Sequence, residues 1–271
     1  MTKQNIARAH DALAAADKLL IIAGAGMSVN SGLPDFRGSA GLWAHYPALA
    51  SGNLHFEEIA NPATFKSHPR MAWGFYEHRR HLYRQTEPHQ GYSWLKEFGL
   101  GMAGGAFVYT TNVDGHFLKS GFQEEQIYEV HGSIHHWQCL HDCSSDIWDA
   151  PQQLLPFDAA SCLLEGDLPS CPYCARIARP NILMFSDRTW QERRSQRQAV
   201  AYQNWLNKAG KLAIVEIGAG TDIPTCRWES ERQEGQLIRI NPREATCSND
   251  NGISIPLGGL EALAKILNKS C

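Results

Sequence analysis

Several features that would indicate a membrane or nucleic-acid protein are missing from this sequence. No apolar stretch approaches the roughly 20 residues that a membrane-spanning helix needs. No long run of Lys and Arg forms a platform for nucleic acid. The N-terminal segment is charged throughout and lacks the apolar centre of a signal peptide. We therefore expect a cytoplasmic protein that contacts neither membrane nor nucleic acid.

The composition also gives little support for a disulfide scaffold. The chain has 271 residues and eight cysteines, with 43% apolar and 20% charged residues and a formal net charge of -3. These proportions are ordinary for a globular protein. In a chain of this size without a leader, metal binding or incidental thiols explain the cysteines better than disulfides do.

Short apolar runs alternate with amphipathic helical patterns along the chain. Four runs are typical of strands buried on both faces, and they cover 19–23, 106–110, 212–217 and 237–240. Helical periodicity is found at 5–17, 69–85, 91–98, 190–209 and 259–268. This alternation predicts an α/β fold with a doubly wound parallel sheet, which is the Rossmann-like class.

A glycine-rich turn follows the first predicted strand. Gly24 and Gly26 stand where glycine lets the backbone approach a pyrophosphate and where the next helix offers amide donors. The spacing differs from G-x-G-x-x-G, so this is not the usual dehydrogenase fingerprint. A tight structural turn after a core strand explains the same glycines, and both interpretations stay open.

The segment that comes next has the composition of a loop that closes over a ligand. Gly32 is followed by Leu33, Pro34, Asp35, Phe36 and Arg37. Phe36 can cover a flat heterocycle, and Arg37 can meet a phosphate or order the loop. The alternative interpretation is a surface turn with an ordinary Asp/Arg pair.

Two short-spaced cysteine pairs form a third motif, which reads Cys139-x3-Cys143 and Cys171-x2-Cys174. Pairs of this kind predict a tetrahedral zinc site. Because four thiolates leave no open position for water, the zinc should be structural and not catalytic. His141 is a weaker alternative ligand. The remaining cysteines lack such spacing and are not expected to bind metal: Cys162, Cys226, Cys247 and Cys271.

Two segments interrupt the alternation of strands and helices. We predict a Rossmann-like domain formed by 1–44, 86–134 and 180–271, a helical insertion at 45–85 and a zinc-binding module at 135–179.

Taken together, these motifs resemble the sirtuin (Sir2) family. The resemblance covers about residues 18–268, and the matching segments stand in the family's order at 24–28, 31–37, 111–115, 128–133, 179–181, 216–218 and 240–242. Within the family, the chain is most similar to the class III members, which remove succinyl and malonyl groups.

The resemblance implies an NAD-dependent protein lysine deacylase with NAD as co-substrate and one structural zinc ion. In this family nicotinamide leaves the C1′ carbon of NAD, and the acyl oxygen of the modified lysine attacks that carbon. A histidine then acts as general base on a ribose hydroxyl, and water completes the reaction. The products are free lysine and O-acyl-ADP-ribose, so the partners are acylated lysine side chains of proteins.

The same resemblance assigns roles to individual residues. His131 becomes the general base, a role that suits a side chain titrating near neutral pH. Asn112 lies near the ribose, and Val113 and Asp114 hold the nicotinamide carboxamide at the end of a predicted strand, where open α/β sheets bind ligands. The other implied NAD-binding residues are Gly24, Ala25, Gly26, Ser28, Gly32, Asp35, Phe36, Arg37, Thr111, Gly218, Ala219, Gly220, Asn241 and Leu257.

The sequence departs from the family pattern at two places. Thr111 stands where the family has a ribose-contacting Gln, and Gly218-Ala219-Gly220 replaces Gly-Thr-Ser. These changes remove polar contacts to NAD, although Thr221 compensates for them if the loop is shifted. We expect NAD binding, with its strength left open.

A fourth motif concerns the choice of acyl group. Tyr76 and Arg79 are three residues apart in a predicted helix, so they share one face. A phenol and a guanidinium together can bind a carboxylate, and the pair resembles the Tyr-x-x-Arg of class III sirtuins. The alternative is a solvated basic face with Tyr76 half buried. Arg80 should point about 100° away from Arg79 on a helix.

Three other functions compete with deacylation. A mono-ADP-ribosyltransferase would pass ADP-ribose to a protein, and an NAD hydrolase would use water as acceptor. A catalytically weak NAD or ADP-ribose sensor is supported only by the departures at Thr111 and Ala219. His131 and the paired cysteines favour deacylation over the two enzymatic alternatives, the mono-ADP-ribosyltransferase and the NAD hydrolase.

Overall fold

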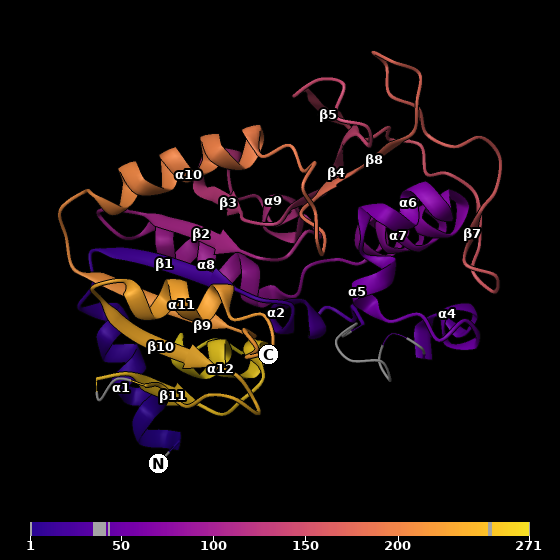
Figure 1. Ribbon diagram of the computed structural model, residues 1–271. Helices are drawn as coiled ribbons and strands as arrows, with labels where there is room; N and C mark the ends of the chain where they lie inside the picture. Colours follow the sequence, from indigo (N-terminus) through magenta and orange to yellow (C-terminus); the bar gives the residue numbers. More distant parts are fainter. Residues whose placement is uncertain (1, 35–41, 43, 249–250, 271) are drawn as a thin grey trace.

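The computed structural model describes residues 2–34, 42, 44–248 and 251–270 (Figure 1). Its larger part is a six-stranded sheet in the order β11-β10-β9-β1-β2-β3, with every neighbouring pair parallel. The strands are β1 (Lys18–Ala23), β2 (Ala106–Thr110), β3 (Ile127–Glu129), β9 (Leu212–Ile217), β10 (Gln236–Ile240) and β11 (Ile253–Ile255).

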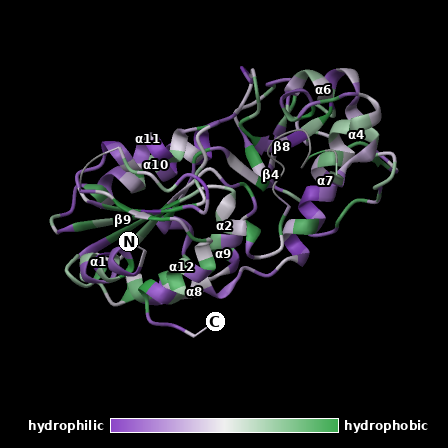
Figure 2. Ribbon diagram, turned by 90° about the horizontal axis from the view of Figure 1, so that it is seen from below, coloured by the Kyte–Doolittle hydropathy of each residue, from purple (hydrophilic) through white to green (hydrophobic). Residues whose placement is uncertain are grey.

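Helices cover both faces of this sheet, and the alternation of side chains along β1 explains why. Leu19 and Ile21 pack with α1 (Thr2–Ala14), α8 (Gln90–Leu100) and α12 (Gly259–Ile266). Leu20 and Ile22 point to the opposite face and pack with α10 (Arg193–Leu206) and α11 (Thr225–Arg232). The central strands are coloured as hydrophobic in Figure 2, while the helices around them show both hydrophobic and hydrophilic residues.

The predicted fold class is confirmed, and so are the four buried strands and the five helical patterns. Strands 106–110 and 212–217 and helix 69–85 have the predicted bounds, whereas the other elements shift by a few residues at one or both ends. The two outer strands, β3 and β11, were not predicted. Each has only three residues, which is too short for an apolar pattern to stand out.

The strand order contains a topological switch between β1 and β9. From β1 the chain builds β2 and β3 on one side, and β9, β10 and β11 then extend the sheet on the other side. Open α/β sheets bind ligands in the crevice outside the carboxyl ends of the strands at such a point.

A smaller unit lies beside the carboxyl edge of the sheet (Figure 1). Its antiparallel strands are β4 (Gly132–Cys139), β5 (Ile147–Asp149) and β8 (Ala178–Ile182), and a separate pair is formed by β6 (Phe157–Asp158) and β7 (Leu163–Leu164). Its helices are α4 (Pro47–Ser51), α5 (Phe56–Ile59), α6 (Pro62–Ser67) and α7 (Pro69–Gln85).

The helical segment and the cysteine-bearing segment share one hydrophobic core. The rings of Trp73 in α7 and Trp137 in β4 have centroids 4.9 Å apart, and the Trp73 indole N–H donates to the carbonyl of Ala178 at 3.0 Å. Leu49, Phe65, Leu140 and Leu164 belong to the same cluster. Segments that are separate in sequence therefore act as a single packing unit.

Short elements complete the described chain: α2 (Gly26–Val29), α9 (His116–Lys119) and a 3-10 turn at Glu124–Gln126. No helix in the described residues is both long and apolar enough to cross a membrane.

Candidate active site

A cavity of about 300 Å³ opens between the carboxyl edge of the sheet and the smaller unit. The loops after β1 and β2 contribute Ala25, Ser28, Leu33, Pro34 and residues 111–114, and His131 follows β3. The opposite wall consists of Phe56, Ala60, Tyr76, Arg79, Tyr83 and residues 182–185. A mostly apolar pocket with a few converging polar groups at this edge is typical of a small-molecule site.

The cavity brings together residues that were predicted from motifs far apart in the sequence. Nine of them line it: Ala25, Ser28, Tyr76, Arg79, Thr111, Asn112, Val113, Asp114 and His131. Eight others do not: Gly24, Gly26, Gly32, Gly218, Ala219, Gly220, Asn241 and Leu257. The predicted loop residues Asp35, Phe36 and Arg37 lie outside the described residues.

Glycines of two loops meet backbone to backbone at the topological switch. A Cβ atom on Gly24 would come within 2.7 Å of the Gly218 carbonyl oxygen, and one on Gly26 within 2.7 Å of the Gly218 Cα. Gly218 itself has a φ of +64°, which favours glycine. These contacts give Gly24 and Gly26 a structural reason to be glycine, in line with the tight-turn interpretation.

A buried polar cluster forms the floor of the cavity. The Ser28 hydroxyl donates to a carboxylate oxygen of Asp114 at 2.6 Å and lies 2.9 Å from the Tyr92 hydroxyl. The Asn112 side-chain amide donates to the carbonyl of Gly24 at 3.0 Å. The second Asp114 oxygen accepts the backbone N–H of His116 at 2.9 Å. The side chains of Asn112 and Asp114 are therefore held in fixed orientations.

Tyr92 in this cluster was not selected from the sequence. It is 1% exposed and belongs to α8, whose amphipathic pattern marks it only as a core residue. Burial holds the pKa of Tyr92 well above its usual value, so the phenol stays protonated. No sequence signal connects it to Ser28, because that contact depends on how α8 packs below the loop after β1.

His131 stands on the loop after β3 and faces the cavity. Burial lowers the pKa of His131, and a hydrogen bond to the backbone of Thr111 offsets part of that effect. The imidazole is therefore neutral near pH 7, which is the protonation state that a general base requires.

Tyr76 and Arg79 form part of the opposite wall and are both buried, with exposed fractions of 1% and 8%. The Arg79 guanidinium carbon lies 5.6 Å from the centre of the Tyr76 ring and 5.3 Å from that of Phe75. Its Nε and one Nη donate to the Tyr83 hydroxyl at 3.0 and 2.7 Å. The alternative of a solvated basic helix face is therefore wrong.

Arg80 does not line the cavity, in agreement with its expected direction. It is 1% exposed and donates to both carboxylate oxygens of the fully buried Glu77, at 2.8 and 2.7 Å. It also reaches the carbonyls of Pro151 and Gln153 at 2.7 and 3.1 Å. Arg80 thus ties the cysteine-bearing segment to α7, and its replacement would disturb folding.

The two departures from the family pattern have local partners in the structure. The Thr111 hydroxyl lies 3.5 Å from the Cys226 sulfur. Thr221 is exposed, and its hydroxyl donates to the Glu244 carboxylate at 2.6 Å. The carbonyl of Ala219 accepts the Asn241 amide at 2.8 Å. The loop that contains Ala219 is therefore held by side chains from neighbouring segments.

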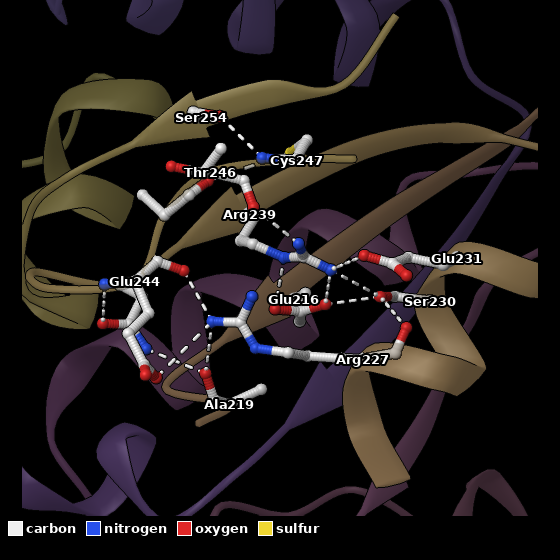
Figure 3. A network of polar contacts seen from close by, with 12 residues as sticks. Glu216, Ala219, Arg227, Ser230, Glu231, Arg239, Glu244, Thr246, Cys247 and Ser254 are labelled. Atoms are coloured by element: carbon white, nitrogen blue, oxygen red, sulfur yellow. Dashed lines mark hydrogen bonds and ion pairs between the residues drawn. The ribbon is translucent and has the colours of Figure 1, made fainter. Parts of the chain in front are cut away.

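A buried ion pair lies in the sheet two residues before this loop begins (Figure 3). Glu216 and Arg239 are direct neighbours on β9 and β10, and Arg239 donates to both Glu216 oxygens at 2.7 and 2.9 Å. Arg239 also binds Glu231 at 2.9 Å and the carbonyl of Thr246 at 2.8 Å. A single charge within each of the runs LAIVEI and QLIRI was a sequence signal for this pair.

The four paired cysteines form one cluster in the described residues, with all ligand atoms within 4.8 Å of one another. Sulfur atoms of Cys139 and Cys174 are 3.7 Å apart, and those of Cys143 and Cys171 are 3.5 Å apart. A tetrahedron with Zn–S bonds of about 2.3 Å has edges of about 3.8 Å, whereas a disulfide needs about 2.05 Å. The predicted thiolate set therefore fits a structural zinc ion, and His141 does not belong to the cluster.

Comparison with known proteins places this site in a family. A family model described as "Sir2 family" matches residues 24–214. A protein of Thermococcus sibiricus named NAD-dependent protein deacylase is 32% identical over 239 residues, which are 84% of this chain and 81% of that protein. A protein of the same name from Pyrococcus furiosus is 33% identical over 178 residues, which are 65% of this chain and 63% of that one.

Solved structures agree with the fold. A crystal structure of a Sir2 homologue in complex with NAD superposes with a TM-score of 0.71 at 21% identity, covering 97% of this chain and 92% of the other. At that identity the likeness concerns the fold alone, whereas the family model covers most of the chain. The chain therefore belongs to the Sir2 family.

Proposed function

We propose that this protein removes acyl groups from lysine side chains of proteins in a reaction that consumes NAD, with His131 as the general base. The observation that carries the proposal is that Asn112, Asp114 and His131 line one cavity, opposite Tyr76 and Arg79. Membership of the Sir2 family, in which the compared relatives are named NAD-dependent protein deacylases, supports the same activity.

NAD supplies an electrophilic C1′ carbon with nicotinamide as its leaving group. Asn112 and Asp114 lie at the end of β2, and their orientations are fixed by Gly24 and Ser28. We assign Asp114 and Val113 to the nicotinamide carboxamide and Asn112 to the adjoining ribose. A preorganised carboxylate and amide stabilise developing positive charge more in the transition state than in the ground state.

We assign the proton transfer to His131. Because its pKa is lowered by burial, the imidazole is ready to accept a proton from a ribose hydroxyl at neutral pH. We assign the rest of NAD to Ala25, Thr111, the loop at Gly218–Gly220, Asn241 and Leu257. The resemblance to the family adds Asp35, Phe36 and Arg37 to the NAD-binding residues.

The proposed domain division follows from these roles. We propose residues 1–44, 86–134 and 180–271 as the NAD-binding domain, 45–85 as the helical insertion and 135–179 as the zinc-binding module. Strands β4 and β8 of the smaller unit extend across the boundaries at 134/135 and 179/180. The shared core of the last two segments supports a cleft in which the acyl-lysine enters between the two halves.

Acyl groups that end in a carboxylate are the proposed preferred substrates. Tyr76 and Arg79 meet in the cavity wall, where a guanidinium and a phenol can both bind a carboxylate. Burial raises the pKa of Tyr76 to about 12, so its hydroxyl remains a donor. Succinyl- and malonyl-lysine fit this chemistry, whereas acetyl-lysine offers no charge.

Incubation of the protein with NAD and an acyl-lysine peptide, separately and together, tests the activity. A deacylase releases nicotinamide and free lysine only when both are present. A hydrolase needs NAD alone, a mono-ADP-ribosyltransferase leaves ADP-ribose on a protein, and a sensor consumes neither compound. The result expected of a hydrolase, of a mono-ADP-ribosyltransferase or of a sensor would overturn the proposal.

The acyl preference is tested with Arg79→Met. We expect this change to raise KM for succinyl-lysine and to reduce the ratio of kcat/KM between succinyl- and acetyl-lysine about tenfold, since a hydrogen bond to a charged group contributes about 1.5–3 kcal/mol. Arg70→Met is the matched control, because Arg70 lies on the same helix but is exposed and bonds only the carbonyls of Leu164 and Gly166. A wild-type protein that prefers acetyl-lysine would contradict the acyl assignment.

A further inference from the structure

A second tyrosine of α7 lies beside Arg79 in the cavity wall. We propose that Tyr83 is a third specificity residue, which holds the Arg79 guanidinium with its oxygen and donates its own proton to the carboxylate of an acidic acyl group. This inference rests on the proposed function, and it adds to the site a residue that the Tyr76/Arg79 pattern does not contain.

The contact between Tyr83 and Arg79 sets the direction of the guanidinium. The Tyr83 oxygen accepts Nε–H at 3.0 Å and an Nη–H at 2.7 Å, so it occupies the side edge of the planar fork. With that edge held, the plane of the group and the direction of its Nη end are determined. Tyr83 is one helical turn after Arg79, and both side chains line the cavity.

The Tyr83 hydroxyl can still donate a hydrogen bond to a ligand. A phenol has one donor and two acceptor sites, and the two bonds from Arg79 use the acceptor sites. Among the residues that the structure describes, none accepts a hydrogen bond from this hydroxyl, which is bonded only by Arg79. Burial raises the pKa of Tyr83, an effect that Arg79 only partly offsets, so the proton stays on the oxygen. A ligand oxygen in the cavity could accept it.

The surroundings of Arg79 favour the binding of a negatively charged ligand group. Aromatic rings surround Arg79, with Phe56, Phe75 and Tyr83 centred 5.9, 5.3 and 5.5 Å from the guanidinium carbon. The low polarity of such walls strengthens a charge-assisted hydrogen bond. Asp114, the acid that lines the cavity, is engaged by Ser28 and the His116 N–H. The positive end of the cavity is thus at Arg79.

These contacts define the class of acyl group. A short chain that ends in a carboxylate would receive the Arg79 fork, the Tyr83 proton and the Tyr76 proton on its two oxygens. A neutral acyl group such as acetyl would use none of the three. Tyr83 therefore contributes to the discrimination between the two kinds of substrate.

The test compares Tyr83→Phe with the wild type on succinyl- and acetyl-lysine versions of one peptide. We expect the succinyl-to-acetyl ratio of kcat/KM to fall roughly tenfold, mainly through KM for the succinyl peptide. Calorimetric titration of the succinyl peptide without NAD should show a similar loss of affinity. Tyr128→Phe is the control, since Tyr128 is half-buried, packs on Tyr109 and does not line the cavity.

The double variant Tyr83→Phe/Arg79→Met separates a shared role from two independent ones. If both side chains serve the same carboxylate, the double variant should show little further loss beyond Arg79→Met. Suppose that the succinyl-to-acetyl ratio of kcat/KM is unchanged in Tyr83→Phe, while Arg79→Met loses the preference for succinyl-lysine. This result would overturn the role of Tyr83 and leave the proposed function intact. If Tyr83→Phe lowers kcat/KM equally for the succinyl and acetyl peptides, Tyr83 acts only in folding. This result would also overturn its role in specificity. A wild type without a preference for succinyl-lysine would overturn both this inference and the acyl assignment.

Discussion

The hydroxyl of Ser28 donates a hydrogen bond of 2.6 Å to the carboxylate of Asp114, although the two residues are 86 positions apart in sequence. The bond joins α2, which follows β1, to the loop after β2 at the cavity floor. It orients one oxygen of Asp114, while the backbone N–H of His116 orients the other. The proposed carboxamide site thus depends on two segments at once.

Ser28→Ala should lower kcat/KM for NAD by about tenfold to a hundredfold, because a hydrogen bond to a charged group contributes about 1.5–3 kcal/mol. Steady-state rates of nicotinamide release over a range of NAD concentrations would measure the effect. Ser93→Ala is the control, because the Ser93 hydroxyl lies on α8 and bonds only the carbonyl of Gln90. Equal rates for Ser28→Ala and wild type would contradict the role of this bond.

His131→Ala should reduce deacylation by about 10² to 10⁴, the usual cost of losing a general base. NAD affinity should change much less, since the change removes a proton acceptor and not the walls of the site. Single-turnover assays of lysine release, together with NAD titrations, would separate the two effects. A variant with wild-type turnover would rule out the proposed mechanism.

The pH dependence of the reaction follows from the lowered pKa of His131. The base must be neutral, and burial keeps it neutral to lower pH than an ordinary histidine, whose pKa is about 6.5. We therefore expect the acidic limb of kcat/KM to lie below about pH 6.5, with activity lost as the pH falls through it. The residual activity of His131→Ala should lack this limb. An acidic limb of kcat/KM above about pH 6.5 would contradict the assignment of His131 as the general base.

One zinc ion per chain should remain with the purified protein. Cys171→Ser should lose the metal and unfold the smaller unit, because binding and folding are coupled at structural zinc sites. Deacylation should then decline indirectly. His141→Ala and Cys247→Ser should keep the full zinc content by elemental analysis, since neither residue belongs to the cluster. Metal-free protein with full activity would refute this prediction.

Arg239→Met should destabilise the protein by about 3–5 kcal/mol, the usual cost of leaving a buried charge without its partner. Glu216 would remain in the sheet core with an exposed fraction of only 1% of its side chain. Urea denaturation would measure the loss. Replacing both residues, as Glu216→Leu with Arg239→Met, should recover much of the stability, because the charge that remains without Arg239, that of Glu231, has a side chain that is 33% exposed. A single variant as stable as the wild type would contradict this view of the pair.

Several of these features could be predicted from local patterns. The apolar run at 19–23 predicts a buried central strand, and the spacing of the cysteine pairs predicts a closed thiolate site, because both signals involve residues near one another in sequence. Tyr76 and Arg79 share a helix face for the same reason. The Arg79–Tyr83 contact has the spacing of one helical turn, but its importance appears only when the cavity is known.

The sequence by itself determined the family, the fold class, the central strands and the ligand set of the zinc site, since each depends on residue type and short spacing. Tertiary structure alone decided that Tyr92 supports Ser28, that Arg80 pairs with Glu77 and reaches the carbonyl of Pro151, and that the two inserted segments share one core. It also decided which oxygen of Asp114 is held by which loop. These contacts join side chains whose separation in space depends on the path of the whole chain and on how helices pack against the sheet, and no local pattern of residues specifies that path.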